Sequence, residues 1–197
     1  MDPHPLDGNL RFFEGAVNPH FMDDILSEVG IYLKCQLTYA KGWPGRATQD
    51  HKMARFGDPE VTYSYRGKDK PVHPMTDLLD YYRDVIEEKI GWRANCCVVN
   101  LYTGEGDLFP HRDSQYIPEL GENPTIVSLS FGERRNFLVY ELDEKDKRKP
   151  KPFVIPLGPG DMLVMENEFD AKFHHAIKPE PHRAGLRLSL TFRKHLV

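Results

Sequence analysis

From Gly91 onward the sequence is built of short segments in which apolar and polar residues alternate. A period of two residues is typical of a β-strand that buries one of its faces. Residues 187–193, Arg-Leu-Ser-Leu-Thr-Phe-Arg, alternate throughout, and Gly- and Pro-rich turns such as residues 157–160 separate the segments. We therefore predict strands over residues 95–102, around residue 111, and over residues 125–131, 135–142, 152–156, 161–165, 174–176 and 187–193.

The N-terminal half contains two segments with helical signals. Asn18 and Pro19 predict the N-cap and first position of a helix that Gly30 ends. Thr76 predicts the N-cap of a second helix, which Gly91 ends. Helices followed by many short strands predict an antiparallel double-sheet jelly roll with the helices packed on one sheet.

The remaining segments are predicted from weaker local patterns. Residues 10–13 and 62–65 alternate and are predicted as strands. Residues 38–56 contain a Trp-Pro-Gly sequence and are predicted as an exposed turn flanked by strands. Residues 143–151 are strongly charged and are predicted as the tip of a hairpin.

Composition fits a compact soluble enzyme with one domain, since 197 residues and 40% hydrophobic content suffice for a core. No apolar run approaches the roughly 20 residues of a membrane span, and the N-terminus lacks the features of a secretory signal. Cys35, Cys96 and Cys97 offer no disulfide framework, so we expect an intracellular, reducing location. The net charge of −4 argues against a strongly basic surface, although residues 145–151 and the C-terminus concentrate basic residues.

Three residues with metal-binding side chains stand out: His111, Asp113 and His175. Two His and one carboxylate can bind one face of an octahedral Fe(II) and leave the opposite face open for a co-substrate and O2. Residues two apart on a strand point to the same side, so His111 and Asp113 can reach one metal from one strand. Composition alone yields about one His-x-Asp triplet in such a chain, so the triplet depends on its context. Zn²⁺ uses the same ligand types, which leaves a hydrolase open.

Arg187 and Arg193 share one face of their predicted strand, while Leu and Phe residues take the other. A guanidinium matches a carboxylate with two parallel hydrogen bonds, which makes Arg187 a candidate clamp for a dicarboxylate. A Zn hydrolase needs no such clamp. The alternation also allows a pair of surface arginines on an edge strand.

The motifs occur in a fixed order: Asn100-x-Tyr102, His111-x-Asp113, residues 128–132, His175, and residues 187–193. Together they resemble the AlkB family of Fe(II)- and 2-oxoglutarate-dependent dioxygenases, particularly its nucleic-acid dealkylases. The resemblance covers roughly residues 48–197, and residues 54–65 resemble the nucleotide-recognition segment of the duplex-DNA repair members. Ser189 departs from the pattern, which usually has Asn at this position.

This resemblance implies one domain, residues 1–197, with helices and a nucleotide-recognition lid in residues 1–92 and a jelly-roll catalytic core in residues 93–197. It implies that His111, Asp113 and His175 are catalytic and hold Fe(II). His175 is preferred over His174 because residues 176–179 continue the family pattern. Further implied roles are binding of the co-substrate 2-oxoglutarate by Asn100, Tyr102, Arg187 and Arg193, and binding of the substrate base by Tyr63 and Tyr65.

The implied reaction is O2-dependent hydroxylation of an N-alkyl carbon on 1-methyladenine or 3-methylcytosine in DNA, with release of formaldehyde. Two departures concern the substrate. Ser114 and Gln115 follow His-x-Asp where the DNA-repair members usually have an acidic residue. The region with Tyr39, Trp43 and Pro44 shows no clear equivalent of the wedge that duplex-specialised members insert.

Several alternatives remain open at this level. The same fold could act on RNA, on an RNA modification, on a protein side chain or on a lipid-like substrate. Aromatic packing is the alternative role for the two tyrosines. A catalytically silent jelly-roll binding module and a Zn hydrolase are the alternatives from other classes. We expect a monomer with a nucleic-acid partner and no membrane association.

Overall fold

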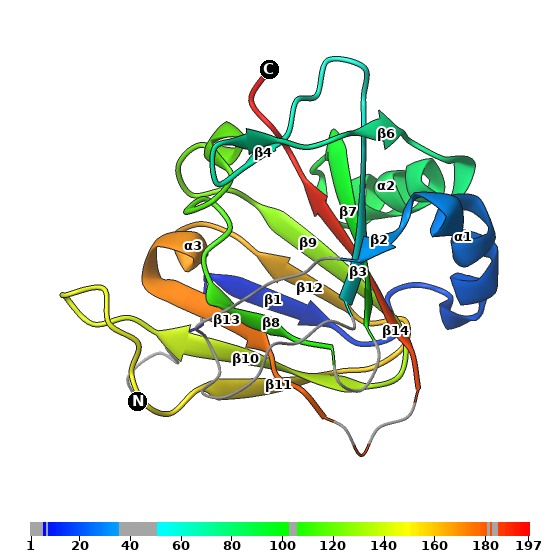
Figure 1. Ribbon diagram of the computed structural model, residues 1–197. Helices are drawn as coiled ribbons and strands as arrows, with labels where there is room; N and C mark the ends of the chain where they lie inside the picture. Colours follow the sequence, from blue (N-terminus) through cyan, green and yellow to red (C-terminus); the bar gives the residue numbers. More distant parts are fainter. Residues whose placement is uncertain (1–5, 7, 36–50, 103–105, 181, 183–184) are drawn as a thin grey trace.

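The computed structural model describes residues 6, 8–35, 51–102, 106–180, 182 and 185–197 of the chain. Its core consists of two antiparallel sheets that face each other (Figure 1). The large sheet runs in the order β1 (Leu10–Phe13), β12 (Met162–Met165), β9 (Ile126–Gly132), β14 (Arg187–Arg193), β7 (Cys96–Tyr102), β3 (His51–Gly57) and β2 (Lys34–Cys35), with β6 (His73–Pro74) pairing in parallel with β3. The small sheet runs in the order β11 (Phe153–Leu157), β10 (Arg135–Glu141), β13 (Phe173–Ile177) and β8 (Leu108–His111).

Helices cover the outer face of the large sheet, at the right of Figure 1. They are the short 3-10 helix η1 (Pro19–Phe21), α1 (Met22–Val29), the 3-10 helix η2 (Gly30–Tyr32) and α2 (Asp77–Ile90). Helix α2 follows its sequence signals: the Thr76 hydroxyl accepts from the Leu79 N–H at 3.4 Å, and Gly91 takes φ 70 in the left-handed region. Such an N-cap contributes about 1 kcal/mol.

Two main apolar clusters hold these layers together. The first lies between the helices and the large sheet and includes Ile25, Tyr82, Ile86, Leu188 and Phe192. The second lies between the two sheets and includes Leu163 and Met165 from the large sheet with Phe137, Phe173 and Ile177 from the small one. The large sheet therefore packs apolar side chains against the helices on its outer face, which leaves its inner face for the site.

Short elements close one end of the sheets. These are the hairpin of β4 (Ser64–Tyr65) and β5 (Lys68–Asp69), the 3-10 helix η3 (Pro118–Leu120) and the one-turn helix α3 (Phe169–Lys172). A third, small cluster lies beneath the hairpin and includes Tyr63, Cys96, Ile117 and Leu120. Among the residues described, no helix has the length and apolar content to cross a membrane.

The predicted mainly-β jelly roll with helices on one sheet is confirmed. The strands at residues 10–13 and 187–193 have the predicted bounds, and Cys96 and Cys97 lie in different clusters on opposite faces of β7 as free thiols. The hairpin tip at 143–151 joins β10 to β11.

Three local predictions were wrong. The bound of the turn predicted over residues 38–56 was wrong, since residues 51–56 belong to a flanking strand, β3, which pairs along its full length with β7. The turn residues themselves, 38–50, lie outside the described part of the chain. Only Ser64–Tyr65 of the predicted strand 62–65 is a strand, because its partner is the two-residue β5. Asp113 is not on a strand, since β8 ends at His111.

Candidate active site

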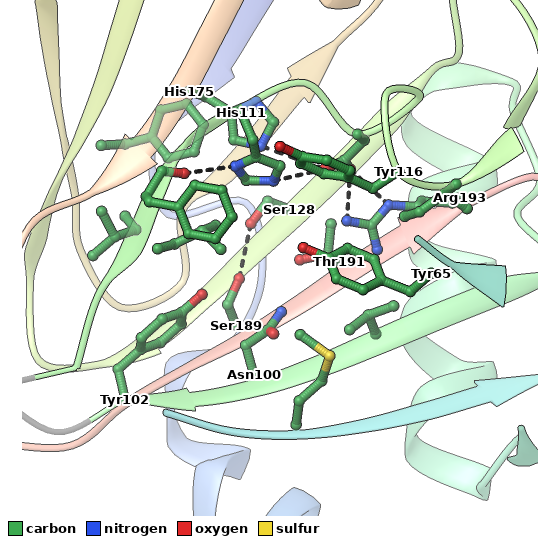
Figure 2. Close-up of a pocket in the computed structure, with 18 of the residues that line it drawn as sticks. Tyr65, Asn100, Tyr102, His111, Tyr116, Ser128, His175, Ser189, Thr191 and Arg193 are labelled. Atoms are coloured by element: carbon green, nitrogen blue, oxygen red, sulfur yellow. Dashed lines mark hydrogen bonds and ion pairs between the residues drawn. The ribbon is translucent and has the colours of Figure 1, made fainter. Parts of the chain in front are cut away.

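The inner face of the large sheet carries its polar residues in aligned rows. On β14, Ser189 lies opposite Asn100 of β7 and Ser130 of β9, and Arg187 lies opposite Tyr102. Asn100, Tyr102, Arg187 and Ser189 line a pocket between the two sheets, as Figure 2 shows for Asn100, Tyr102 and Ser189. The strict period of two on the central strand thus places an apolar row in the core and a polar row in the pocket. The arginines of β14 are not surface residues on an edge strand.

His111, Asp113 and His175 converge at the wall formed by the small sheet. One candidate ligand atom from each residue lies within 4.8 Å of the other two, and all three residues are buried. The Oδ1 atom of Asp113 lies 3.1 Å from Nε2 of His111 and 3.6 Å from Nε2 of His175. β8 and β13 pair with His111 opposite His175, which brings the rings side by side (Figure 2).

The backbone of β8 orients His111 for metal binding. Its Nδ1 donates to the Phe109 carbonyl oxygen at 2.8 Å. This bond turns Nε2 toward the Asp113 carboxylate, 3.1 Å away. In a neutral imidazole that donates through Nδ1, Nε2 is the atom with the lone pair that a metal needs. A divalent metal fits the donor set, and the bond to Phe109 orients the ring as metal-binding His residues require.

Electrostatics keeps the candidate ligands in their binding forms. Burial lowers the pKa of His175 to about 3, so this imidazole stays neutral at physiological pH. Burial alone would raise the pKa of Asp113, but the neighbouring Arg193 guanidinium holds it well below its ordinary range. Nε of Arg193 donates to Oδ2 of Asp113 at 2.7 Å, and Nη2 lies 2.6 Å from the same oxygen. A neutral imidazole and an ionised carboxylate are the forms that bind metals.

Arg187 is a buried cation without an acidic partner among the described residues. It is 2% exposed, its Nη2 donates to the Ser130 hydroxyl at 3.0 Å, and its guanidinium carbon lies 5.4 Å from the centre of the Tyr102 ring. Its Nε has no hydrogen-bond partner. Burial lowers its pKa to about 10, so it remains charged at neutral pH. A buried, incompletely bonded charge is costly unless a ligand completes it, and an anionic carboxylate has the matching geometry.

Ser128, Ser189 and Asn100 form the floor between the triad and Tyr102 (Figure 2). Ser189 stands where the AlkB pattern usually has Asn, and its hydroxyl lies 3.0 Å from that of Ser128. The hydroxyl that replaces the usual amide therefore has a hydrogen-bond partner on the neighbouring strand. Asn100 and Tyr102, which the sequence predicted for the co-substrate, both line the pocket.

The predicted substrate residues Tyr63 and Tyr65 both line the pocket but differ in exposure. Tyr63 is 4% exposed and packs between Arg55 and His195, with ring centres of Tyr63 and His195 5.1 Å apart. Tyr65 is half-buried, and its ring lies 5.5 Å from that of Tyr116. Tyr65 thus has a ring face nearer the opening, whereas Tyr63 is largely packing.

Sequence reasoning missed several residues of this site. Asp170, on α3, is buried, and its carboxylate accepts the backbone N–H of Asp113 at 2.9 Å and of Ser114 at 3.2 Å. It fixes the turn that carries Asp113, and a four-residue helix gives no periodic signal that could have predicted it. Thr191 also lines the pocket, and its even spacing from Arg187 was a usable signal.

Comparison with known proteins agrees with this architecture. A family model described as the 2OG-Fe(II) oxygenase superfamily matches residues 12–193. The DNA oxidative demethylase ALKBH2 of Homo sapiens is 29% identical over 150 residues, which are 74% of this chain and 57% of that protein. The human alpha-ketoglutarate-dependent dioxygenase alkB homolog 3 is 33% identical over 150 residues, or 74% of this chain and 51% of that protein. The chain thus matches little more than half the length of these curated relatives.

Two further similarities span nearly the whole chain. The uncharacterized protein R406 of Acanthamoeba polyphaga mimivirus is 24% identical over 196 residues, covering 98% of this chain and 95% of that protein. The solved structure of OsALKBH1 matches with a TM-score of 0.64 at 19% identity, covering 94% of this chain and 98% of that chain. The structural likeness supports the same fold.

The fold and the family model define the class of protein as the 2OG-Fe(II) oxygenase superfamily. Within that superfamily, the chain belongs to the AlkB family of dioxygenases, for which the sequence motifs had indicated Fe(II), 2-oxoglutarate and O2 as the cofactor set.

Proposed function

We propose that the protein is an oxidative demethylase that removes N-alkyl groups from the bases of DNA. RNA is the second candidate substrate. The resemblance to the nucleic-acid dealkylases implies 1-methyladenine and 3-methylcytosine as lesions. The observation that carries the proposal is the pairing of a convergent His-Asp-His cluster with a buried Arg187 that has no acidic partner in the described chain. The relatives named for DNA oxidative demethylation support the substrate class.

The metal would be held by Nε2 of His111, Nε2 of His175 and Oδ1 of Asp113, the atoms that approach one another. Fe(II) at this position supplies the activation of O2 for oxidation of a C–H bond. Arg193 bonds only the other oxygen, Oδ2, and so leaves Oδ1 available. Asp170 holds the backbone of the Asp113 turn in place.

The 2-oxoglutarate would lie along the polar row of β14. Arg187 would receive its distal carboxylate with Nε and Nη atoms, and Tyr102 would border the same group. Nη1 of Arg193 is buried without a hydrogen-bond partner in the described structure and would donate toward the end nearest the metal. Asn100, between these two arginines in register, would hydrogen-bond the co-substrate between its ends.

The substrate base would enter from the side of Tyr65 and Tyr116, flipped or single-stranded, because a stacked base hides the alkylated edge. Tyr65 would stack on the base, and the more deeply buried Tyr63 would contribute packing in the same apolar cluster. In the overall reaction an N-methyl C–H becomes C–OH, one oxygen of O2 goes to that hydroxyl, and the other goes to succinate as CO2 leaves. The N–C bond of the hydroxymethyl group then breaks: its electron pair returns to the ring nitrogen, formaldehyde leaves, and for 1-methyladenine and 3-methylcytosine the O–H proton goes to solvent.

Several broader expectations belong to the same proposal. We propose a single catalytic domain with a lid in the N-terminal part, acting as a monomer. An intracellular, reducing location suits the free Cys96 and Cys97 and an oxidisable metal.

The test measures succinate and formaldehyde release with methylated single- and double-stranded DNA and RNA. Release of both products with methylated but not unmethylated strands is expected. Succinate release with only a modified RNA, or with a peptide, would favour the same-fold alternatives. A protein that binds methylated DNA without any turnover would be a binding module, and turnover that requires Zn²⁺ without 2-oxoglutarate would indicate a hydrolase.

A further inference from the structure

Besides Arg187 and Arg193, another buried guanidinium lines the pocket, beside the tyrosines proposed to bind the substrate. Arg55, on β3, is 6% exposed and lines the pocket with Tyr63 and Tyr65. Its guanidinium carbon lies 4.8 Å from the centre of the Tyr63 ring, and Nη2 lies 3.0 Å from the sulfur of Met53. Its Nε has no hydrogen-bond partner within the described chain. Thioether sulfur is a weak acceptor, so donors of Arg55 remain for a molecule in the pocket.

An exposed guanidinium packs on aromatic rings that line the pocket. Arg66 is exposed, and its guanidinium carbon lies 4.5 Å from the centre of the Tyr116 ring and 5.6 Å from that of Tyr65. The ion pairs of the described residues involve neither Arg55 nor Arg66. Tyr63 and Tyr65, the tyrosines proposed for the substrate base, therefore each lie next to a guanidinium, Arg55 and Arg66 respectively.

Negative charge is scarce where the base would lie. Asp113 and Asp107 are the acidic residues that line the pocket within the described chain. The carboxylate of Asp113 is bonded by Arg193 and is a candidate metal ligand. Asp107 lies at the co-substrate end, where its charge acts on Tyr102.

The neighbouring groups do not balance Arg55 either. Glu119 accepts the backbone N–H of Ser64 at 2.8 Å and does not line the pocket. Burial raises the pKa of Tyr63 to about 12, so its phenol is neutral at physiological pH. Ser114 and Gln115, which follow the metal-binding turn, carry no charge. The described substrate end thus has a positive character.

We propose that this pocket selects electrically neutral N-methylated bases with carbonyl oxygens, such as 1-methylguanine and 3-methylthymine, over the cationic 1-methyladenine and 3-methylcytosine; this rests on the proposed function. In the neutral bases the methyl group replaces a ring N–H proton, and adjacent carbonyl oxygens accept hydrogen bonds. In the cationic bases the methyl group is added to a ring nitrogen that had no proton. Arg55 repels such a cation at low dielectric and donates to a carbonyl oxygen.

The experiment compares oligonucleotides of single-stranded DNA that differ only in the lesion. The pairs are 1-methylguanine against 1-methyladenine and 3-methylthymine against 3-methylcytosine, with formaldehyde release as the readout at neutral pH. The neutral member of each pair is expected to have a kcat/KM about tenfold higher or more. Equal rates, or faster turnover of the cationic members, would overturn the charge selection and leave the proposed function standing. Absence of formaldehyde from all four would overturn the proposed function and this inference with it.

Two substitutions of Arg55 separate charge from packing. Arg55→Met keeps an unbranched side chain that fills the space of the arginine stem but has no charge, and it should raise turnover of the cationic lesions relative to the neutral ones by about tenfold. Arg55→Lys keeps the charge and should retain the wild-type order, whether or not overall activity falls. Arg93→Met, an equal charge change at an exposed position on another face, should leave the ratio unchanged. If Arg55→Met and Arg55→Lys change the turnover of cationic relative to neutral lesions by the same factor, the charge of Arg55 does not set the selection and the inference is wrong.

Discussion

Replacing Arg187 with Lys should weaken 2-oxoglutarate binding while preserving the charge of the site. The wild-type guanidinium is 2% exposed, with one neutral hydrogen bond to Ser130 and a free Nε. A carboxylate received by Nε and an Nη gains two parallel charge-assisted bonds, and a lysine ammonium can keep only one of them. Losing one such bond costs about 1.5–3 kcal/mol, or roughly 10- to 100-fold in affinity.

The assay titrates 2-oxoglutarate at saturating methylated oligonucleotide, and then the oligonucleotide at saturating 2-oxoglutarate. The KM for 2-oxoglutarate should rise roughly 10- to 100-fold, while the KM for the oligonucleotide changes little. Arg134→Lys, at a neighbouring exposed arginine, is the matched control and should leave both values unchanged. An unchanged KM for 2-oxoglutarate in Arg187→Lys would refute the clamp and make Arg193 the next candidate.

Three more perturbations follow from the geometry. His111→Ala or Asp113→Ala should abolish Fe(II) binding, measured by calorimetry, while far-UV circular dichroism remains native; undiminished binding would refute the metal assignment. Tyr65→Ala should slow turnover of a methylated oligonucleotide by roughly ten- to a hundredfold, for about 1–3 kcal/mol of lost stacking, and spare the substrate-independent succinate release; a parallel loss of both would make Tyr65 structural. In the metal-free protein, the unfolded chain protonates His175 near its ordinary pKa of 6.5 and the folded chain only near 3. The free energy of unfolding should therefore fall as pH drops through this window, by up to about 1.4 kcal/mol per unit, and this slope should flatten in His175→Gln.

Where the alternation is strict and both strand neighbours are long, the sequence predicted the structure closely. Residues 187–193 pair along their full length with β7 and β9, so no competing register can place Arg187 and Arg193 elsewhere. The order of the motifs predicted that the three metal-binding candidates and the two arginines belong to one site, and all five residues line the same pocket.

Prediction failed where tertiary pairing, and not local pattern, decides the conformation. Residues 51–57 form a strand because β7 offers them a free edge, although their own sequence does not alternate clearly. Asp113 lies past the end of β8, and its position depends on Asp170, a contact between residues far apart in the chain. Arg55 belongs to the segment that resembles a nucleotide-recognition region, but no individual role was predicted for it, because only the pairing of β3 with β7 places it beside Val98 in the pocket.

We propose that this pocket couples 2-oxoglutarate oxidation to removal of an N-methyl group from a nucleic-acid base. The most direct measurement is the ratio of succinate to formaldehyde released with a methylated oligonucleotide, with and without Fe(II). Roughly equimolar release of the two products is expected, since each oxidation consumes one 2-oxoglutarate and frees one methyl carbon, and no release is expected without the metal. Succinate that forms at the same rate with methylated and unmethylated strands, without formaldehyde, would contradict it.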